Sequence, residues 1–280
     1  MLSDKYEKRN NVKDNNGNYY KIEYKNKYPN GYGSDIFAYI SKDNSSWSEA
    51  GRIFTSGFLL YEAWGHSLSI SKDNILCFTC VASEQGNMQG GVKVYFSKSL
   101  NGGSSWSGLT AVSDGVKAGR ADPMAVSYND NVYAVWVEKG NNFNRTGGIY
   151  FSGSSDNGDS WSQDMRLGEG EDACIKVDED GIIYIVYTDS SKKNIVFFSY
   201  SKDGGSRWHT EATDELPVLV YEPYVIIDPV KIIIIFNALE PSISGLLMAG
   251  SDMNYKKYYF DSKNMGKEWS EIKLLQEDKN

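Results

Sequence analysis

The sequence predicts an all-β fold, a β-propeller of four-stranded antiparallel blades. One turn signature, S-x-D-x-G-x-x-W, recurs five times along the 280 residues. The tryptophans that end the five copies are 59, 55, 47 and 61 residues apart, a period typical of four-stranded blades. Aromatic residues, which favour strands, make up 14% of the chain. The five tryptophans are Trp47, Trp106, Trp161, Trp208 and Trp269.

Two copies of the signature are complete, two carry Asn in place of Asp, and one is degraded. The complete copies span 154–161 and 201–208, and the copies with Asn span 99–106 and 262–269. The first copy, 41–47, lacks the glycine and is one residue short. Because Asp or Asn accepts hydrogen bonds from nearby backbone N–H groups and Gly supplies positive φ, each copy predicts a closed hairpin turn that the tryptophan covers.

Each unit is expected to run inner strand, second strand, third strand, signature turn and outer strand. Aromatic runs at 149–151, 196–198 and 258–260 predict third strands that lead into the turns. A polar turn followed by an apolar run predicts each second strand. These segments are 18–22, 74–78, 131–136, 181–187 and 231–236.

The sequence predicts a single domain, residues 1–280, because no stretch rich in Pro or Ser divides it. We favour five blades. Six blades are the alternative, with a degenerate sixth unit hidden within residues 240–260. The five repeat units have approximate bounds 1–52, 53–111, 112–166, 167–213 and 214–280.

The tandem signatures resemble the Asp-box, or BNR, repeat of sialidases and related propellers, and the resemblance spans nearly the whole chain. The boxes themselves are expected to hold blades together and to take no part in chemistry. The resemblance implies a propeller that acts on carbohydrate. Chemistry is expected at the opposite end of the sheets from the boxes, on the loops between second and third strands and the connections between units.

Alignment of the units on their second strands places acidic residues where the inner strands begin. Carboxylates that converge there would disfavour one another's charged form, which suits general acid catalysis on a glycosidic bond. The alternative is that water or a bound cation neutralises them. The aligned segments are Trp64-Gly65-His66, Ala121-Asp122-Pro123, Asp172-Ala173-Cys174 and Tyr221-Glu222-Pro223.

The resemblance to sialidases implies specific roles for residues at this end. Those enzymes carry a tyrosine nucleophile paired with a glutamate, an aspartate acid/base and three arginines that grip the sugar carboxylate. Tyr221 takes the place of the nucleophile, and Asp172 or the adjoining Glu171 takes the place of its base. Asp35, shortly before the first box, takes that of the acid/base. The candidate carboxylate clamp is Arg9, Arg120 and Arg145.

Three functions remain open at this point. The first is a retaining, sialidase-like exo-glycosidase that releases a terminal, anionic sugar. The second is a glycan-binding propeller without turnover, favoured because no Arg-Ile-Pro follows Arg9 and only lysines such as Lys192 and Lys193 stand where another arginine is expected. Trp64, His66 and the loop 28–33 would then stack against sugar rings. The third is a protein-interaction scaffold.

A variant of the first function uses three axial acids, Asp122, Asp172 and Glu222, on a neutral sugar.

The composition of the chain limits the classes of partner and cofactor that we expect it to bind. The formal net charge of −8 argues against nucleic acid, which needs a positive surface. No apolar run approaches the roughly 20 residues of a membrane-spanning helix, and residues 1–18 are too polar for a signal peptide. No cofactor or metal site is predicted, since Cys77, Cys80 and Cys174 form no metal pattern and are expected to be buried free thiols. A surface, secreted or virion-associated role is compatible with these features.

Overall fold

The computed structural model describes the chain in segments. They fall into two compact units, here called the N-terminal unit, which reaches to Gly168, and the C-terminal unit, which continues from Glu169. The expectation of a single domain stays a prediction. The segments are residues 11–25, 35–53, 57–60, 65–84, 91–115, 121–138, 147–239 and 255–275.

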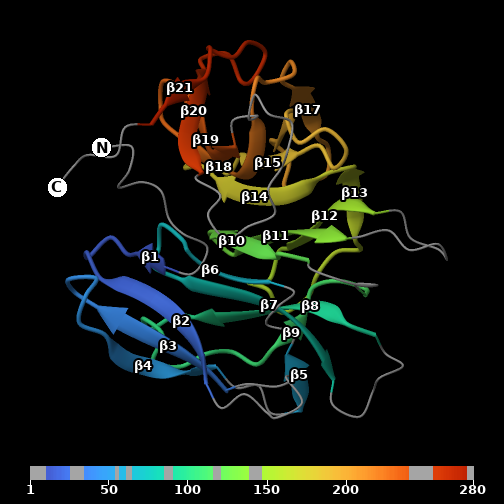
Figure 1. Cartoon of the computed structure of the whole chain (residues 1–280). Coiled ribbons are helices and arrows are strands. Elements are labelled where there is room, and N and C mark those ends of the chain that lie inside the picture. Colours follow the sequence, from blue (N-terminus) through green and yellow to red (C-terminus); the bar gives the residue numbers. More distant parts are fainter. Residues whose placement is uncertain are drawn as a thin grey trace. The chain divides into compact units, whose positions relative to one another are not determined.

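The N-terminal unit contains three antiparallel sheets (Figure 1). In the second sheet both β5 and β6 pair with β7, so the expected inner strand is in two pieces. The first sheet is β1 (Asn11–Lys13), β2 (Tyr19–Lys25), β3 (Asp35–Ser41) and β4 (Ser48–Ile53). The second is β5 (Phe58–Leu60), β6 (His66–Ile70), β7 (Leu76–Glu84), β8 (Lys93–Ser99) and β9 (Thr110–Ala111). The third is β10 (Met124–Tyr128), β11 (Asn131–Glu138), β12 (Gly148–Ser154) and β13 (Met165–Gly168).

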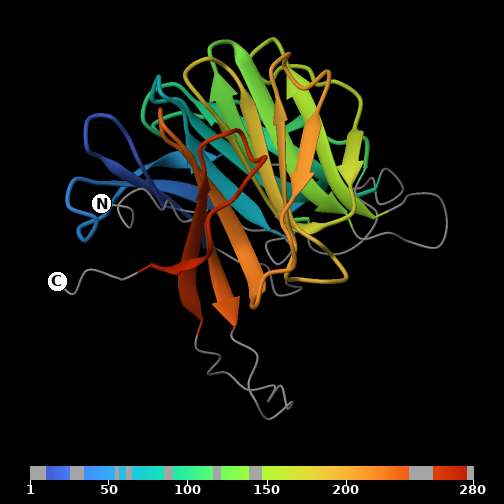
Figure 2. The ribbon, with the colours of Figure 1, turned by 90° about the horizontal axis from the view of Figure 1, so that it is seen from above.

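The C-terminal unit contains two four-stranded antiparallel sheets, and the second of them is the orange and red sheet of Figure 2. Strand order follows chain order in both, which confirms the predicted sequence of strands within a repeat. Since residues 240–254 lie outside the described part, the number of blades stays a prediction. The sheets are β14 (Glu171–Val177), β15 (Ile183–Thr188), β16 (Val196–Ser201) and β17 (His209–Ala212), then β18 (Leu219–Ile227), β19 (Ile232–Leu239), β20 (Lys256–Ser262) and β21 (Lys273–Leu274).

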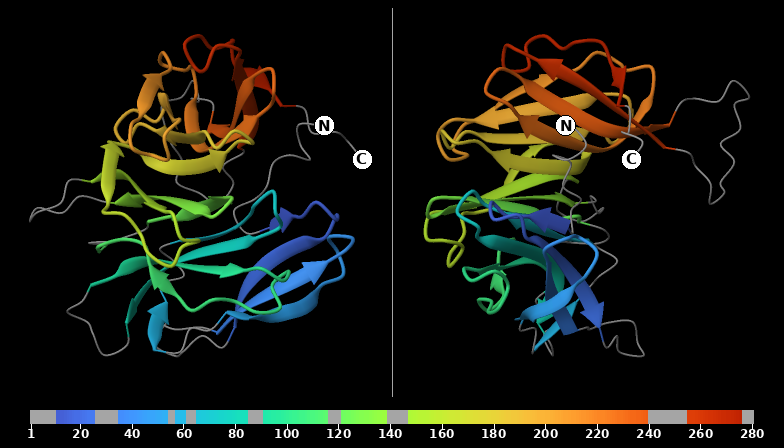
Figure 3. Two further views of the ribbon diagram at one scale, coloured as in Figure 1. Left: turned by 180° about the vertical axis from the view of Figure 1, so that it is seen from behind. Right: turned by 90° about the vertical axis from the view of Figure 1, so that its left-hand side faces the viewer.

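The second strand of the second sheet, β7, lies at the centre of the core because sheets cover both of its faces. In the N-terminal unit, Cys80 on β7 packs in a cluster with residues of the first sheet, whereas Cys77 packs in a cluster with residues of the third. Both thiols and Cys174 are free and buried, as predicted, and burial raises the pKa of Cys77 to about 11. The first sheet is the blue one in both views of Figure 3. No helix in the described segments is long and apolar enough to cross a membrane.

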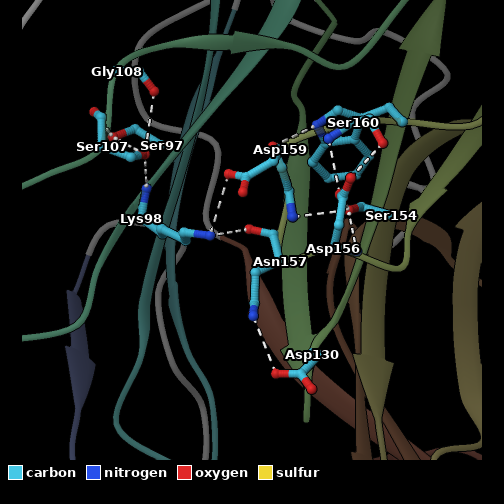
Figure 4. Close-up of polar contacts among 12 residues, drawn as sticks. Ser97, Lys98, Ser107, Gly108, Asp130, Ser154, Asp156, Asn157, Asp159 and Ser160 are labelled. Carbon is cyan, nitrogen blue, oxygen red and sulfur yellow. Dashed lines mark hydrogen bonds and ion pairs between the residues drawn. The ribbon is translucent and has the colours of Figure 1, made fainter.

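The signature turns close as the sequence predicts, and the third box shows the pattern (Figure 4). The Ser154 hydroxyl donates to Asp156 Oδ1 at 2.7 Å and accepts the Gly158 N–H at 2.8 Å. Asp156 Oδ1 also accepts the Ser160 N–H at 2.8 Å. Trp161 Nε1 donates to the Gly158 carbonyl at 3.2 Å. The box is therefore a self-contained clamp around one left-handed glycine, whose φ is 87°.

This third box also binds the sheet before it. Gly158 lies directly against the Phe96 ring of β8, where any Cβ would overlap, and the Trp161 ring meets Phe96 edge-on at 5.4 Å. Lys98 Nζ donates to the Asn157 carbonyl at 2.5 Å. Asn157 Nδ2 in turn donates to Asp130 Oδ1 at 3.1 Å, so the box lies at the same end of the sheet as the β10–β11 turn (Figure 4). Both the clamping role and this shared end were predicted.

The same packing recurs in the second and fifth boxes. Gly103 lies against Ala38 of the first sheet, and Gly266 lies against Phe198 of β16. In the first box, Asn44 takes the left-handed conformation with φ 59°, but no glycine follows it as Gly158 follows Asn157 in the third box.

We expect the box carboxylates to make the fold sensitive to acid. Hydrogen bonds from Ser160 lower the pKa of Asp156 to about 2, and those from Arg207 lower the pKa of Asp203 to about 2. Because an unfolded Asp titrates near about 3.9, these groups stabilise the fold above that pH and lose the contribution as pH falls toward 2. The double variant Asp156→Asn, Asp203→Asn should show a smaller decrease in Tm between pH 5 and pH 2 than the unsubstituted chain.

Asparagine is a fair replacement in this test because a natural box uses it. In the fifth box, Asn264 Oδ1 accepts the Glu268 N–H at 3.0 Å, as Asp156 does from Ser160. An equal decrease in Tm for both proteins would show that other carboxylates govern acid unfolding.

Candidate active site

Three acidic residues occupy the same backbone position at the start of successive inner strands. Asp122, Asp172 and Glu222 have φ of 43°, 55° and 49°. A β-bulge accompanies the last two, because the pairing register shifts between Glu171 and Cys174 and between Tyr221 and Tyr224. Left-handed backbone costs a non-glycine residue about 1–2 kcal/mol, and such residues are common at functional sites. The three carboxylates thus stand where the local backbone would favour glycine.

The pairing of the strands corrects the alignment of the repeats by one residue. Glu171 pairs with Thr188 and Tyr221 with Asn237, while Cys174 pairs with Val186 and Tyr224 with Ile235. Glu171, not Asp172, is therefore equivalent to Tyr221, and Asp172 is equivalent to Glu222. The expected equivalence of Asp172 with Tyr221 is wrong because the turn after β14 is one residue longer than the turn after β18: residues 178–182 separate the paired Val177 and Ile183, whereas residues 228–231 separate the paired Ile227 and Ile232.

Lys193 joins the starts of the two inner strands in the C-terminal unit. Its Nζ lies 3.0 Å from Glu171 Oε2 on β14 and 5.0 Å from the ring centroid of Tyr221 on β18. The main chain of Lys193 is bound to the same strand, since its carbonyl accepts the Val220 N–H at 2.6 Å. Lys193 thereby contacts both Glu171, the candidate base, and Tyr221, the candidate nucleophile.

The loop that carries Lys193 connects the second and third strands, β15 and β16. It lies along the connection that leads into β18, because Leu216 donates its N–H to the Asn194 carbonyl at 2.8 Å and Asn194 Nδ2 donates to the Leu216 carbonyl at 3.2 Å. Lys192 pairs with Glu215 at 2.5 Å. The loop between the second and third strands and the connection between the two sheets thus lie at the same end of the C-terminal unit, as predicted.

Tyr221 and Glu222 have further partners from the second sheet of the unit. Asn237 Nδ2 donates to Glu222 Oε2 at 3.0 Å. The ring of Tyr221 meets that of Tyr255 edge-on, with centroids 5.4 Å apart, and Tyr255 is 42% exposed. The site is open, since the side chains of Lys193 and Glu171 are about one third exposed. It combines carboxylates, a cation and tyrosine rings within reach of solvent.

Negative charge around Lys193 determines its protonation. Burial alone would lower the pKa of Lys193, but the hydrogen bond to Glu171 and the charges of Asp172 and Glu171 outweigh burial and raise the pKa above its ordinary value. Lys193 is therefore an ammonium at neutral pH, and its pair with Glu171 is an ion pair.

The N-terminal unit holds the other described candidates. Asp35 on β3 forms an ion pair with Arg52 on β4. Asp122 is 9% exposed, and Gly65 approaches its backbone so closely that a Cβ on Gly65 would lie 2.6 Å from Asp122 Cα. His66 packs against the ring of Tyr24 with centroids 4.8 Å apart, a contact that fits a structural role.

Several candidates lie outside the described residues, so their roles stay predictions. These are Trp64, Arg9, Arg120, Arg145 and the loop 28–33. Sequence reasoning considered Lys193 only as a weak substitute for an arginine. The repeated strand pattern could have placed it on a 2–3 loop, but no local signal shows that this loop folds onto the next inner strand.

Comparisons with known proteins agree with this architecture. The model of the BNR repeat-like domain matches residues 73–280. A protein of unknown function from Dyadobacter fermentans is 14% identical, with 95% of this chain and 92% of that chain covered and a TM-score of 0.56. An α-L-arabinofuranosidase from Fusarium graminearum is 13% identical, with 94% and 79% covered and a TM-score of 0.59. An ulvan lyase is 13% identical, with 97% and 71% covered and a TM-score of 0.55.

Among curated proteins, none matches the chain. Likeness at this level of identity shows the fold, an all-β propeller of four-stranded antiparallel sheets, and carries no statement about substrate. Since the repeat-like model covers residues 73–280, most of the sequence, the chain belongs to the BNR repeat-like family.

Proposed function

We propose that this protein processes glycans and hydrolyses a terminal sugar at the end of the sheets opposite the boxes. The observation that carries the proposal is the gathering of Glu171 and Tyr221 around Lys193, from the starts of two neighbouring inner strands. Solved structures with the same fold include an α-L-arabinofuranosidase and an ulvan lyase, both named for carbohydrate substrates.

In the first arrangement of roles, Tyr221 is the nucleophile. Its hydroxyl oxygen attacks the anomeric carbon while its proton passes to Glu171, and a general acid protonates the oxygen of the leaving group as the glycosidic bond breaks. Water, deprotonated by that same group, then attacks the anomeric carbon and releases Tyr221, which recovers its proton from Glu171. Two displacements give retention of configuration.

A second arrangement uses Asp122, Asp172 and Glu222. Their shared left-handed backbone position supports it, since three strained carboxylates at equivalent sites are unexpected for a purely structural role. In this arrangement one carboxylic acid protonates the leaving oxygen, and a carboxylate activates water or attacks the anomeric carbon.

Glycan binding without turnover is the second candidate function. It is favoured by the ion pair of Glu171 with Lys193, because a carboxylate bound by an ammonium accepts the Tyr221 proton less readily. The half-exposed ring of Tyr255 would serve such a binding site equally well.

A panel of 4-methylumbelliferyl glycosides, namely the sialoside, arabinofuranoside, galactoside and xyloside, tests these functions. We expect turnover of one substrate, with kcat lowered at least about hundredfold in the variant that lacks the key group. Loss in Tyr221→Phe supports the tyrosine arrangement, and loss in Asp172→Asn and Glu222→Gln with activity kept in Tyr221→Phe supports the three-acid arrangement. Tyr200→Phe, on β16, is the matched control.

Absence of turnover with binding on a glycan array would leave the second candidate. Absence of both would overturn the proposal.

A further inference from the structure

We propose that the Glu171 carboxylate, which occupies the Lys193 ammonium, makes this site selective for uncharged sugars over acidic ones. The inference rests on the proposed function and concerns the substrate class of the same site. It departs from the expectation of an anionic sugar, which the resemblance to sialidases implied.

The argument begins with the partners of the Lys193 ammonium. Glu171 Oε2 lies 3.0 Å from Nζ, and the face of the Tyr221 ring lies beneath it, with the centroid at 5.0 Å. An ammonium has three donors and no acceptor. With a carboxylate and a ring already bound, its charge is largely balanced within the protein. A sugar carboxylate would have to displace Glu171 in order to bind the Lys193 ammonium.

Negative charge around the ammonium works against that displacement. Asp172 adds a second carboxylate to the field at Lys193. Glu222, at the equivalent position of the next sheet, lies in the same unit and is bound by the neutral amide of Asn237. Like charges repel one another, and at a protein surface this repulsion is stronger than in bulk water. An acidic sugar meets this repulsion at each approach to a carboxylate.

An uncharged sugar is accepted by the same groups. Sugar hydroxyls donate hydrogen bonds, and ionised carboxylates are acceptors with several lone pairs each. Tyr255, 42% exposed and packed edge-on against Tyr221, offers an apolar surface to a sugar ring. The arrangement therefore matches a neutral ring with hydroxyl groups at its edge.

The neighbouring pair on the same loop supplies a matched control. Lys192 Nζ binds Glu215 Oε1 at 2.5 Å, with side chains 61% and 58% exposed. Glu171→Gln and Glu215→Gln change the net charge by the same amount and each leaves one lysine without its carboxylate. Only Glu171→Gln leaves that lysine beside Tyr221.

The experiment measures binding and not turnover, because Glu171 is also a candidate for the chemistry. Affinities for methyl galactoside and methyl galacturonide, and for methyl glucoside and methyl glucuronide, are measured by ligand-detected NMR at low and high salt. The unsubstituted protein should prefer the neutral member of whichever pair binds by about tenfold at low salt, and less at high salt. Glu171→Gln should reduce or reverse this preference by about tenfold, whereas Glu215→Gln should leave it unchanged.

Lys193→Met should retain the preference for the neutral sugar. The inference is overturned if the unsubstituted protein prefers the acidic sugar, or if Glu215→Gln shifts the preference as much as Glu171→Gln. Release of an acidic sugar from a glycan would overturn this inference and leave the proposed function intact. If no sugar binds and no glycoside is hydrolysed, both fail.

Discussion

Gly65→Ala is expected to destabilise the N-terminal unit by about 4 kcal/mol. Gly65 has φ 101°, and a Cβ built there lies 2.6 Å from Asp122 Cα and 2.8 Å from the Asp122 nitrogen. Backbone atoms cannot rotate out of the way as the end of a flexible side chain can. The added methyl group therefore forces the start of the third inner strand to move, in addition to the strain of a left-handed alanine.

Gly57→Ala separates these two contributions. Gly57 has a similar φ of 88°, but an added Cβ meets no atom of the described segments within 4 Å. Its replacement should cost only the conformational penalty, about 1–2 kcal/mol. Urea unfolding of both variants measures the difference. Equal losses in the free energy of unfolding would show that the close approach of Gly65 to Asp122 adds nothing to the cost of Gly65→Ala.

Trp161→Ala is expected to cost about 3 kcal/mol, because the Trp161 ring joins the third box to the second sheet. The ring packs edge-on against Phe96, which is 1% exposed, and its Nε1 donates to the Gly158 carbonyl. Removal of the indole leaves a cavity between two sheets and exposes the clamp to water.

Trp47→Ala is the comparison for this second expectation. Trp47 belongs to the degraded first box, and Lys21 Nζ lies over its ring at 4.7 Å. A cation–π contact on a solvated surface contributes about 0.5–1 kcal/mol, so the loss should be about 1 kcal/mol. Thermal unfolding of both variants tests the contrast. If Trp47→Ala is as destabilising as Trp161→Ala, the first box also acts as a clamp, despite its missing glycine.

The repeated pattern was sufficient to predict the fold class. Hydrogen bonding by Asp156 and the positive φ of Gly158 follow from residue chemistry that acts over four or five positions. The order of strands follows as well, since a turn precedes each second strand and, after the first sheet, these strands are rich in apolar residues. Such local rules need no knowledge of the rest of the chain.

The candidate site could be predicted only in part. Tyr221 and Glu171 were found, but their equivalence depends on how β18 pairs with β19 and how β14 pairs with β15, not on the residues beside them. The position of Lys193 depends on a loop that binds the connection to β18 through main-chain atoms. Main-chain contacts between distant segments leave little trace in side-chain identity, so the residue that joins the site was missed.

The packing of three boxes against the sheet that precedes them in the chain has a consequence for folding during synthesis. Gly103, Gly158 and Gly266 each lie against the sheet that precedes their own in the chain. A growing polypeptide made at about 5–20 residues per second presents that sheet before the box appears. Each of these three boxes therefore docks on a surface that has already left the ribosome, and assembly can advance vectorially with translation.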